Sequence, residues 1–209
     1  MSEIELKHLK KYIKNKSTYL IFGNSHLDQY SSIKELNNNI KTISKDFDNN
    51  SIIFYFGDIP DKENPNIGFI ISQIKSRRND IEIICIGLDD YDDTFINKNI
   101  EYPIWIDKFL WITCKTNKKR GVNNNSNKPL GLTKIWYELN KIQPFKSIYL
   151  FGGDIITLEE YYLAKELNIN TIYLPIKRKY LGDGNTLIKK KHSDEQKFGP
   201  TFILNTSSN

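Results

Sequence analysis

The chain has 209 residues, and its 39% hydrophobic and 12% aromatic content is enough to build a packed core and to exclude a disordered protein. Thirty Lys and Arg against twenty-five Asp and Glu give a formal net charge of +5, which by itself does not indicate nucleic-acid binding. No apolar run reaches the ~18 residues of a membrane span, and the charged opening segment is unlike a secretory signal. We therefore expect a cytoplasmic protein with no membrane partner.

Cysteine and histidine usage argues against a metal centre. Cys85 and Cys114 form no Cys-x-x-Cys pair, and Cys85 stands in an apolar run where a buried free thiol is the ordinary interpretation. The three histidines are far apart and match no ligand spacing. The sequence thus predicts no disulfide, no metal and no cofactor.

Strand-like and helix-like segments alternate along the chain. Short runs of β-branched, aliphatic or aromatic residues indicate strands, and apolar residues that recur every three or four positions indicate helices. The expected strands are residues 17–22, 51–56, 81–87, 147–151 and 171–176, with two further short strands at 102–107 and 110–116. The expected helices are residues 33–47, 67–74, 132–142 and 158–167, the second of them with an N-cap and a first-turn proline at Asn64-Pro65.

This alternation predicts the fold class. Strands separated by helices are joined by crossovers that are nearly always right-handed, and these build parallel sheets. The run IEIICIG at 81–87 is apolar at successive positions, which is typical of a strand covered on both faces. We predict an α/β protein with a Rossmann-like three-layer αβα sandwich and a mostly parallel sheet. It would form a single domain over residues 1–209, with a core at about 17–176 and a C-terminal wrap at 177–209.

Four of the expected strands lead into turns that contain glycine. These turns begin at Gly23, Gly57, Gly87 and Gly152. Open parallel sheets bind ligands beyond the carboxyl ends of their strands, where glycine exposes backbone N–H groups and helix N-termini favour phosphate. Glycine is also a common way to leave a strand, so each turn has a purely structural alternative.

The most distinctive motif is Gly152-Gly153, a short spacer, and then Thr157-Leu158-Glu159-Glu160 with Ala164 one turn later. It resembles the SLOG superfamily, which includes the LOG and lysine-decarboxylase-like proteins, and a weaker likeness extends back to residue 19. The resemblance implies a Rossmann-like fold that binds nucleotides or nucleotide-derived ligands, and it suggests a homodimer. Some such proteins are hydrolases that release a base from a ribose phosphate, and others sense ADP-ribose-type signals.

Two departures separate the chain from the hydrolase pattern of that family. The spacer Asp154-Ile155-Ile156 is one residue longer. The arginine–lysine pair before the diglycine strand is replaced by lysines alone, Lys134 and Lys141. Lysine is a point charge and lacks the bidentate fork of arginine. Binding without turnover therefore ranks ahead of hydrolysis.

The candidate site residues come from these turns and this motif. The catalytic candidates are Glu160, to stabilise a ribosyl cation or hold a ribose hydroxyl, and Asp58, to assist proton transfer. The ligand-binding candidates stand at or near strand ends: Gly23, Ser25, Gly57, Gly152, Gly153, Asp154, Thr157, Lys134 and Arg178. Structural alternatives stay open, since Thr157-x-x-Glu160 also fits a capping box and Arg178 also fits a solvated basic loop.

Three functions remain open from the sequence. The first is binding of a nucleotide or ADP-ribose-like ligand at the carboxyl edge of the sheet. The second is an N-glycosidic bond hydrolase or transferase that acts on nucleoside monophosphates. The third is a nucleic-acid or protein-binding module that uses the basic segments 177–179 and 189–191, although a single interleaved tyrosine makes nucleic acid the least favoured partner. The expected partners are a nucleotide-derived small molecule and a second copy of the chain.

Overall fold

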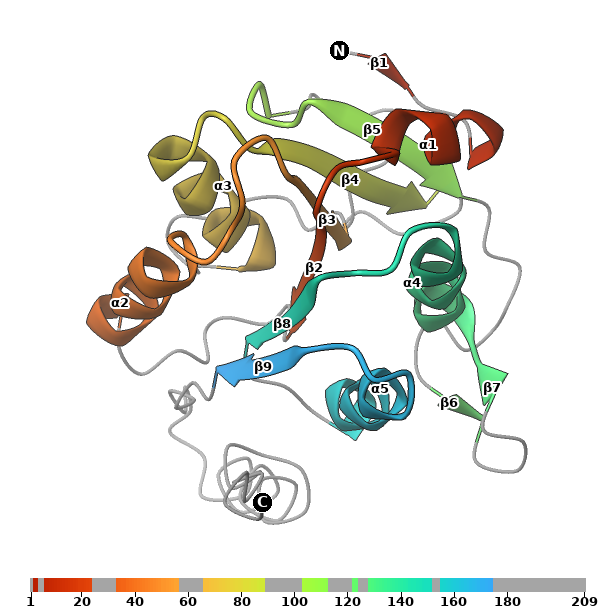
Figure 1. Cartoon of the computed structure of the whole chain (residues 1–209). Helices are drawn as coiled ribbons and strands as arrows, with labels where there is room; N and C mark the ends of the chain where they lie inside the picture. Colours follow the sequence, from red (N-terminus) through yellow and green to blue (C-terminus); the bar gives the residue numbers. More distant parts are fainter. Residues whose placement is uncertain are drawn as a thin grey trace, which may run out of the picture.

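A parallel seven-stranded sheet forms the centre of the computed structural model (Figure 1). The structure describes residues 2–3, 6–23, 33–56, 66–88, 103–112, 122–123, 128–151 and 155–174. The sheet order is β1-β5-β4-β3-β2-β8-β9, and every neighbouring pair is parallel. Its strands are β1 (Ser2–Glu3), β2 (Thr18–Gly23), β3 (Ile52–Phe56), β4 (Glu82–Leu88), β5 (Lys108–Ile112), β8 (Ser147–Phe151) and β9 (Thr171–Leu174).

Helices cover both faces of this sheet, as Figure 1 shows. On one face, α2 (Ile33–Ile43) and α3 (Ile67–Arg77) bury apolar side chains in one cluster, among them Leu36 and Ile40 of α2 and the four isoleucines of α3. On the other face, α1 (Leu6–Ile13), α4 (Gly131–Ile142) and α5 (Ile155–Glu166) contribute to a second cluster. The predicted three-layer α/β fold with a Rossmann-like parallel sheet is confirmed.

Alternation along the strands explains why their sequences are apolar throughout. In β2, Tyr19 and Ile21 enter the cluster under α2 and α3, whereas Leu20 and Phe22 enter the cluster under α1, α4 and α5. Successive side chains of a strand point to opposite faces, so a strand covered on both sides has no polar face. Cys85 of β4 is fully buried, as predicted.

The strand order reverses direction at β2. From β2 the chain adds β3 and β4 on one side through α2 and α3, and later adds β8 and β9 on the other side with α5 between them. Reversing the direction while keeping right-handed crossovers moves the connecting helices to the opposite face, which is where α4 and α5 lie. The boundary between β2 and β8 is therefore the topological switch point of the sheet.

Several local predictions differ from the structure. Helix α1 was not expected, because its lysines mask the spacing of the buried Leu9 and Ile13. The predicted strand at 102–107 is wrong: residues 103–107 form a turn in which Ile106 N–H donates to the Pro103 carbonyl. The N-cap of α3 is Asn66, whose Oδ1 accepts from Phe69 N–H at 2.9 Å. The residues expected to cap it, Asn64 and Pro65, lie outside the described residues.

Two further strands form a small hairpin beside the helical layer. Strands β6 (Val122–Asn123) and β7 (Lys128–Pro129) pair antiparallel next to α4 and α5. In the part of the chain that the structure describes, no helix is both long and apolar enough to cross a lipid bilayer.

Candidate functional site

The carboxyl ends of β2 and β8 meet at the switch point. Gly23, the last residue of β2, pairs with Phe151, the last residue of β8. A Cβ atom built on Gly23 would lie 2.1 Å from the Phe151 carbonyl oxygen, which is far inside van der Waals contact. Only glycine therefore fits at this position, and the predicted site residue Gly23 has a packing reason that does not involve a ligand.

Glu160, the residue expected to be catalytic, lies on α5 and is fully buried. Its Oε1 accepts a hydrogen bond from the Thr133 hydroxyl at 2.6 Å and another from the Trp136 indole N–H at 3.2 Å. Both donors belong to α4 and are themselves fully buried. The carboxyl group of Glu160 thus joins the two helices that flank the switch point.

The contact continues from Trp136 to the sheet. The Trp136 indole stacks on the Phe22 ring with centroids 6.3 Å apart and planes at 24°. Phe22 is the residue before Gly23, so Glu160, Trp136 and Phe22 link α5, α4 and the carboxyl end of β2 in one buried chain of contacts. Through these contacts, Glu160 can fix the positions of α4 and α5 relative to the carboxyl end of β2.

The capping-box interpretation of Thr157 and Glu160 is wrong. Helix α5 begins at Ile155, so Thr157 is its third residue and lies inside the first turn. An N-cap residue precedes the first helical residue, so Thr157 lies too far into α5 to cap it. Thr157 is only 3% exposed, so both residues of the motif face the interior.

The remaining predicted ligand-binding residues divide into two groups. Lys134 lies one turn into α4 with its side chain exposed to solvent, on a different side of the helix from the buried Thr133. The others lie outside the described residues: Ser25, Gly57, Asp58, Gly152, Gly153, Asp154 and Arg178. Among them, Gly57 directly follows β3 and Gly152 directly follows β8, and both strands end at the same edge because the sheet is parallel.

Gly87 was expected to end its strand and begin a turn, but β4 continues one residue further, to Leu88. Gly87 lies inside β4, paired with Trp111 of β5, and a Cβ atom built on it would lie 2.3 Å from the indole of that tryptophan. The half-buried Trp111 therefore occupies the space that a side chain at position 87 would need. Glycine here makes room for an aromatic ring, a reason that the sequence pattern alone did not reveal.

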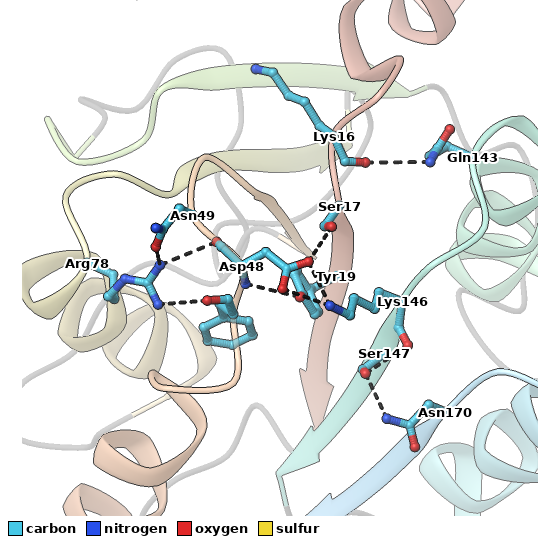
Figure 2. Close-up of polar contacts among 11 residues, drawn as sticks. Lys16, Ser17, Tyr19, Asp48, Asn49, Arg78, Gln143, Lys146, Ser147 and Asn170 are labelled. Atoms are coloured by element: carbon cyan, nitrogen blue, oxygen red, sulfur yellow. Dashed lines mark hydrogen bonds and ion pairs between the residues drawn. The ribbon is translucent and has the colours of Figure 1, made fainter.

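A polar network that was not anticipated lies at the opposite, amino edge of the sheet (Figure 2). Asp48 precedes β3, and its carboxylate accepts hydrogen bonds from Lys146 Nζ at 2.7 Å and from the Ser17 hydroxyl. Ser17 and Lys146 precede β2 and β8, so one carboxylate joins the starts of three neighbouring strands. The hydrogen bonds from Lys146 and then Ser17 hold the pKa of Asp48 below its usual value.

Arg78 extends this network to the end of α2. Its guanidinium donates to the carbonyl oxygens of Ser44 and Phe47, both at 2.9 Å, and to the side chain of Asn49 at 3.1 Å. Arginine has five N–H donors in a fixed fork and can satisfy several carbonyls at a helix end at once. The charged groups at the amino edge are therefore engaged with one another and with the backbone.

The amino and carboxyl edges differ in what they offer a ligand. At the described amino edge, charged side chains form ion pairs and hydrogen bonds to the backbone. The described carboxyl edge instead has Gly23 at the switch point and the N-termini of α4 and α5. Among the described residues, no three His, Cys, Asp or Glu side chains gather as metal ligands would. Comparison of the chain with models of protein families, with curated proteins and with solved structures found no match in any of the three.

Proposed function

We propose that the protein binds a nucleotide or ADP-ribose-like ligand at the carboxyl edge of its sheet, between β2 and β8, without turning it over. The reversal of strand order at this boundary carries the proposal. Where the order reverses, the neighbouring connections leave toward opposite faces, and the crevice between them is where open α/β sheets bind ligands.

The directions of α4 and α5 add electrostatic support. Helix α5 follows the carboxyl end of β8, and α4 leads into the amino end of β8, so both helices begin on the carboxyl side of the sheet. Helix N-termini present unsatisfied N–H groups and a positive dipole end, both of which favour phosphate. A phosphorylated sugar is therefore a suitable ligand for this edge.

The environment of Glu160 favours binding over hydrolysis. A carboxylate that stabilises a ribosyl cation must contact the sugar, but Glu160 is fully buried and its Oε1 already accepts two hydrogen bonds. We assign Glu160 a positioning role: it fixes the starts of α4 and α5 at the spacing that the ligand requires. The resemblance of the diglycine and Thr-x-x-Glu motif to SLOG proteins supports the same ligand class.

The test is a binding screen with AMP, ADP and ADP-ribose as probes. A ligand at a hundred times its dissociation constant stabilises the folded state by about 2.7 kcal/mol, which raises Tm by roughly 5–10 °C for a chain of this size. Calorimetric titration then gives the affinity, and chromatography of each mixture shows whether a base is released. We expect binding and no released base.

Two exposed lysines on α4 provide a matched pair of variants. Lys134 lies near the start of the helix at the carboxyl edge, and Lys141 lies near its end, where it pairs with Glu138. We expect Lys134→Ala to weaken nucleotide binding about tenfold, since one charged contact with phosphate contributes on the order of 1–3 kcal/mol. Lys141→Ala should leave the affinity unchanged. Absence of binding by all three probes would overturn the proposal, and base release would replace it with the hydrolase function.

A further inference from the structure

Helix α1 and the turn that follows it are strongly basic. Residues 7–16 contain five lysines and no acidic residue. This stretch of ten residues carries as much positive charge as the net charge of the whole chain, which is +5. A net charge of that size does not indicate a polyanion as partner, but a local concentration of charge on one surface does.

Folding leaves three of these lysines on the outside of the molecule. Leu9 and Ile13 of α1 are buried against the sheet, whereas Lys10, Lys11 and Lys14 are exposed. Leu9 and Ile13 are four residues apart and form one buried stripe, so Lys10 and Lys11 project from the other sides of the helix. Helix α1 lies on the outside of the fold next to β5 (Figure 1). We call Lys10, Lys11 and Lys14 the α1 basic surface.

The charges of the α1 basic surface are not neutralised by the part of the chain that the structure describes. None of its three side chains forms an ion pair with a described residue. Other lysines do find carboxylates: Lys75 pairs with Asp107 at 2.8 Å and Lys146 pairs with Asp48 at 2.7 Å. The α1 basic surface therefore keeps its positive charge available to a partner.

The carboxylate of Glu82 lies close to the end of α1 but is already engaged. Its Oε2 accepts from Lys16 Nζ at 2.9 Å, and its Oε1 accepts from the Tyr12 hydroxyl. The Nζ atoms of Lys16 and Lys108 each lie 4.7 Å from the centroid of the Tyr12 ring. Two more lysines thus stand beside α1, and the half-buried tyrosine ring already contacts both of their ammonium groups.

A nucleic-acid backbone is the partner that these observations favour. Lysines act as point charges that suit phosphate, and DNA carries one phosphate per ~3.4 Å of each strand. A helix that lies in a membrane surface needs an apolar face for the lipid, but the apolar side chains of α1 belong to the core. We propose that the α1 basic surface binds the phosphate backbone of nucleic acids. Because Tyr12 is covered, binding does not depend on base sequence.

The experiment is a fluorescence-anisotropy titration of the full chain into labelled duplex DNA and labelled single-stranded RNA, each in two unrelated sequences. Neutralising three phosphates of a duplex gives a slope of about −2.7 in a plot of log affinity against log salt. The affinity for duplex DNA should then fall about fortyfold between about 50 and about 200 mM salt. We expect both sequences of each probe to bind with affinities that agree within about twofold.

The test variant replaces Lys10, Lys11 and Lys14 together by glutamine. It should weaken binding at least about tenfold at low salt and reduce the size of the salt slope by about 2–3, since each phosphate contact contributes about one unit. Substitutions at exposed positions change stability by only about 0.5 kcal/mol, so an almost unchanged Tm confirms that the variant is folded.

Helix α2 supplies the matched control. Lys34, Lys41 and Lys45 are exposed on α2 and the turn after it, so replacing all three by glutamine removes the same charge. The exposed Asp46 follows Lys45 directly and opposes the positive charge there, so we expect an affinity within about twofold of the unaltered chain.

Three results would overturn the proposal: neither probe binds at low salt, the α1 variant binds as tightly as the unaltered chain, or the α1 and α2 variants lose affinity equally. Vesicles that contain phosphatidylserine are the last comparison. If the chain binds these vesicles and neither nucleic acid, the basic surface belongs to a membrane partner and the proposal is also overturned. The inference does not rest on the nucleotide site, because α1 contributes none of the residues assigned to that site.

Discussion

Replacing Glu160 should destabilise the fold, because its carboxyl group satisfies two buried donors on another helix. In Glu160→Ala, the Thr133 hydroxyl and the Trp136 indole N–H lose their acceptor where no solvent reaches them. Each buried donor left without an acceptor costs about 1–3 kcal/mol. The cavity left by the lost side chain adds to this, so we expect a loss of about 3–6 kcal/mol in the free energy of unfolding. That is a large fraction of the ~5–15 kcal/mol of a typical domain.

Urea unfolding followed by tryptophan fluorescence measures this loss, and two further variants identify its cause. Glu160→Gln keeps a carbonyl oxygen at the position of Oε1, so it should cost at least about 2 kcal/mol less than the alanine variant. Glu138→Ala on α4 removes an exposed carboxylate paired with Lys141 and serves as the control, with an expected change within about 0.5 kcal/mol.

A double-mutant cycle tests whether Thr133 and Glu160 act together. Thr133→Val removes the hydroxyl while keeping its shape, so in the double variant with Glu160→Ala no hydroxyl is left without an acceptor. The double variant should therefore lose about 1–2 kcal/mol less than the sum of the single variants. If the single losses add within ~0.5 kcal/mol, or if Glu160→Ala costs less than about 1 kcal/mol, the positioning role is refuted.

Three other variants test separate features of the fold. Gly23→Ala should prevent normal folding or cost more than about 3 kcal/mol, because its Cβ would lie 2.1 Å from a carbonyl oxygen of β8; a fully stable variant would contradict the close approach of the two strands. Asn66→Ala should cost about 1 kcal/mol, or roughly 2–4 °C in Tm, since its side chain accepts from a backbone N–H in the first turn of α3; an unchanged Tm would argue against the cap. Because the lowered pKa of Asp48 contributes stability that is present at neutral pH and lost as pH falls through the folded-state pKa, Asp48→Asn should flatten the loss of stability below about pH 4. If the free energy of unfolding falls equally with decreasing pH in both proteins, the pairing of Asp48 with Lys146 is not coupled to folding.

Most of the sheet could be predicted from the sequence, because strands covered on both faces leave an unbroken apolar run. The predicted strand at 147–151 has the same bounds as β8. The four isoleucines of the predicted helix at 67–74 are all buried on α3. Errors occurred where local sequence and tertiary context disagree. The segment containing Trp105 and Ile106 has strand-like composition, but Pro103 begins a turn there instead.

The candidate site was less accessible to sequence reasoning. The motif made Glu160 a candidate, but its partners Thr133 and Trp136 belong to another helix and reach it only through packing. The glycines illustrate the same limit: the need for Gly23 arises from Phe151, and the need for Gly87 arises from Trp111, both remote in sequence. A glycine in a sequence can indicate that another part of the chain packs closely against it, but the sequence does not identify that part.

The central position of β2 has a consequence for the order of assembly. Tyr19 pairs with Ile53 early in the chain but with Ser147 only much later, so one side of β2 can form its ladder long before the other side has a partner. Contacts between distant segments close slowly, and during synthesis the N-terminal half emerges first. Until β8 is synthesised, the edge of β2 that pairs with it is exposed, and β2 is an apolar strand. Protection of nascent chains by a chaperone would thus matter most during the interval between synthesis of β4 and synthesis of β8.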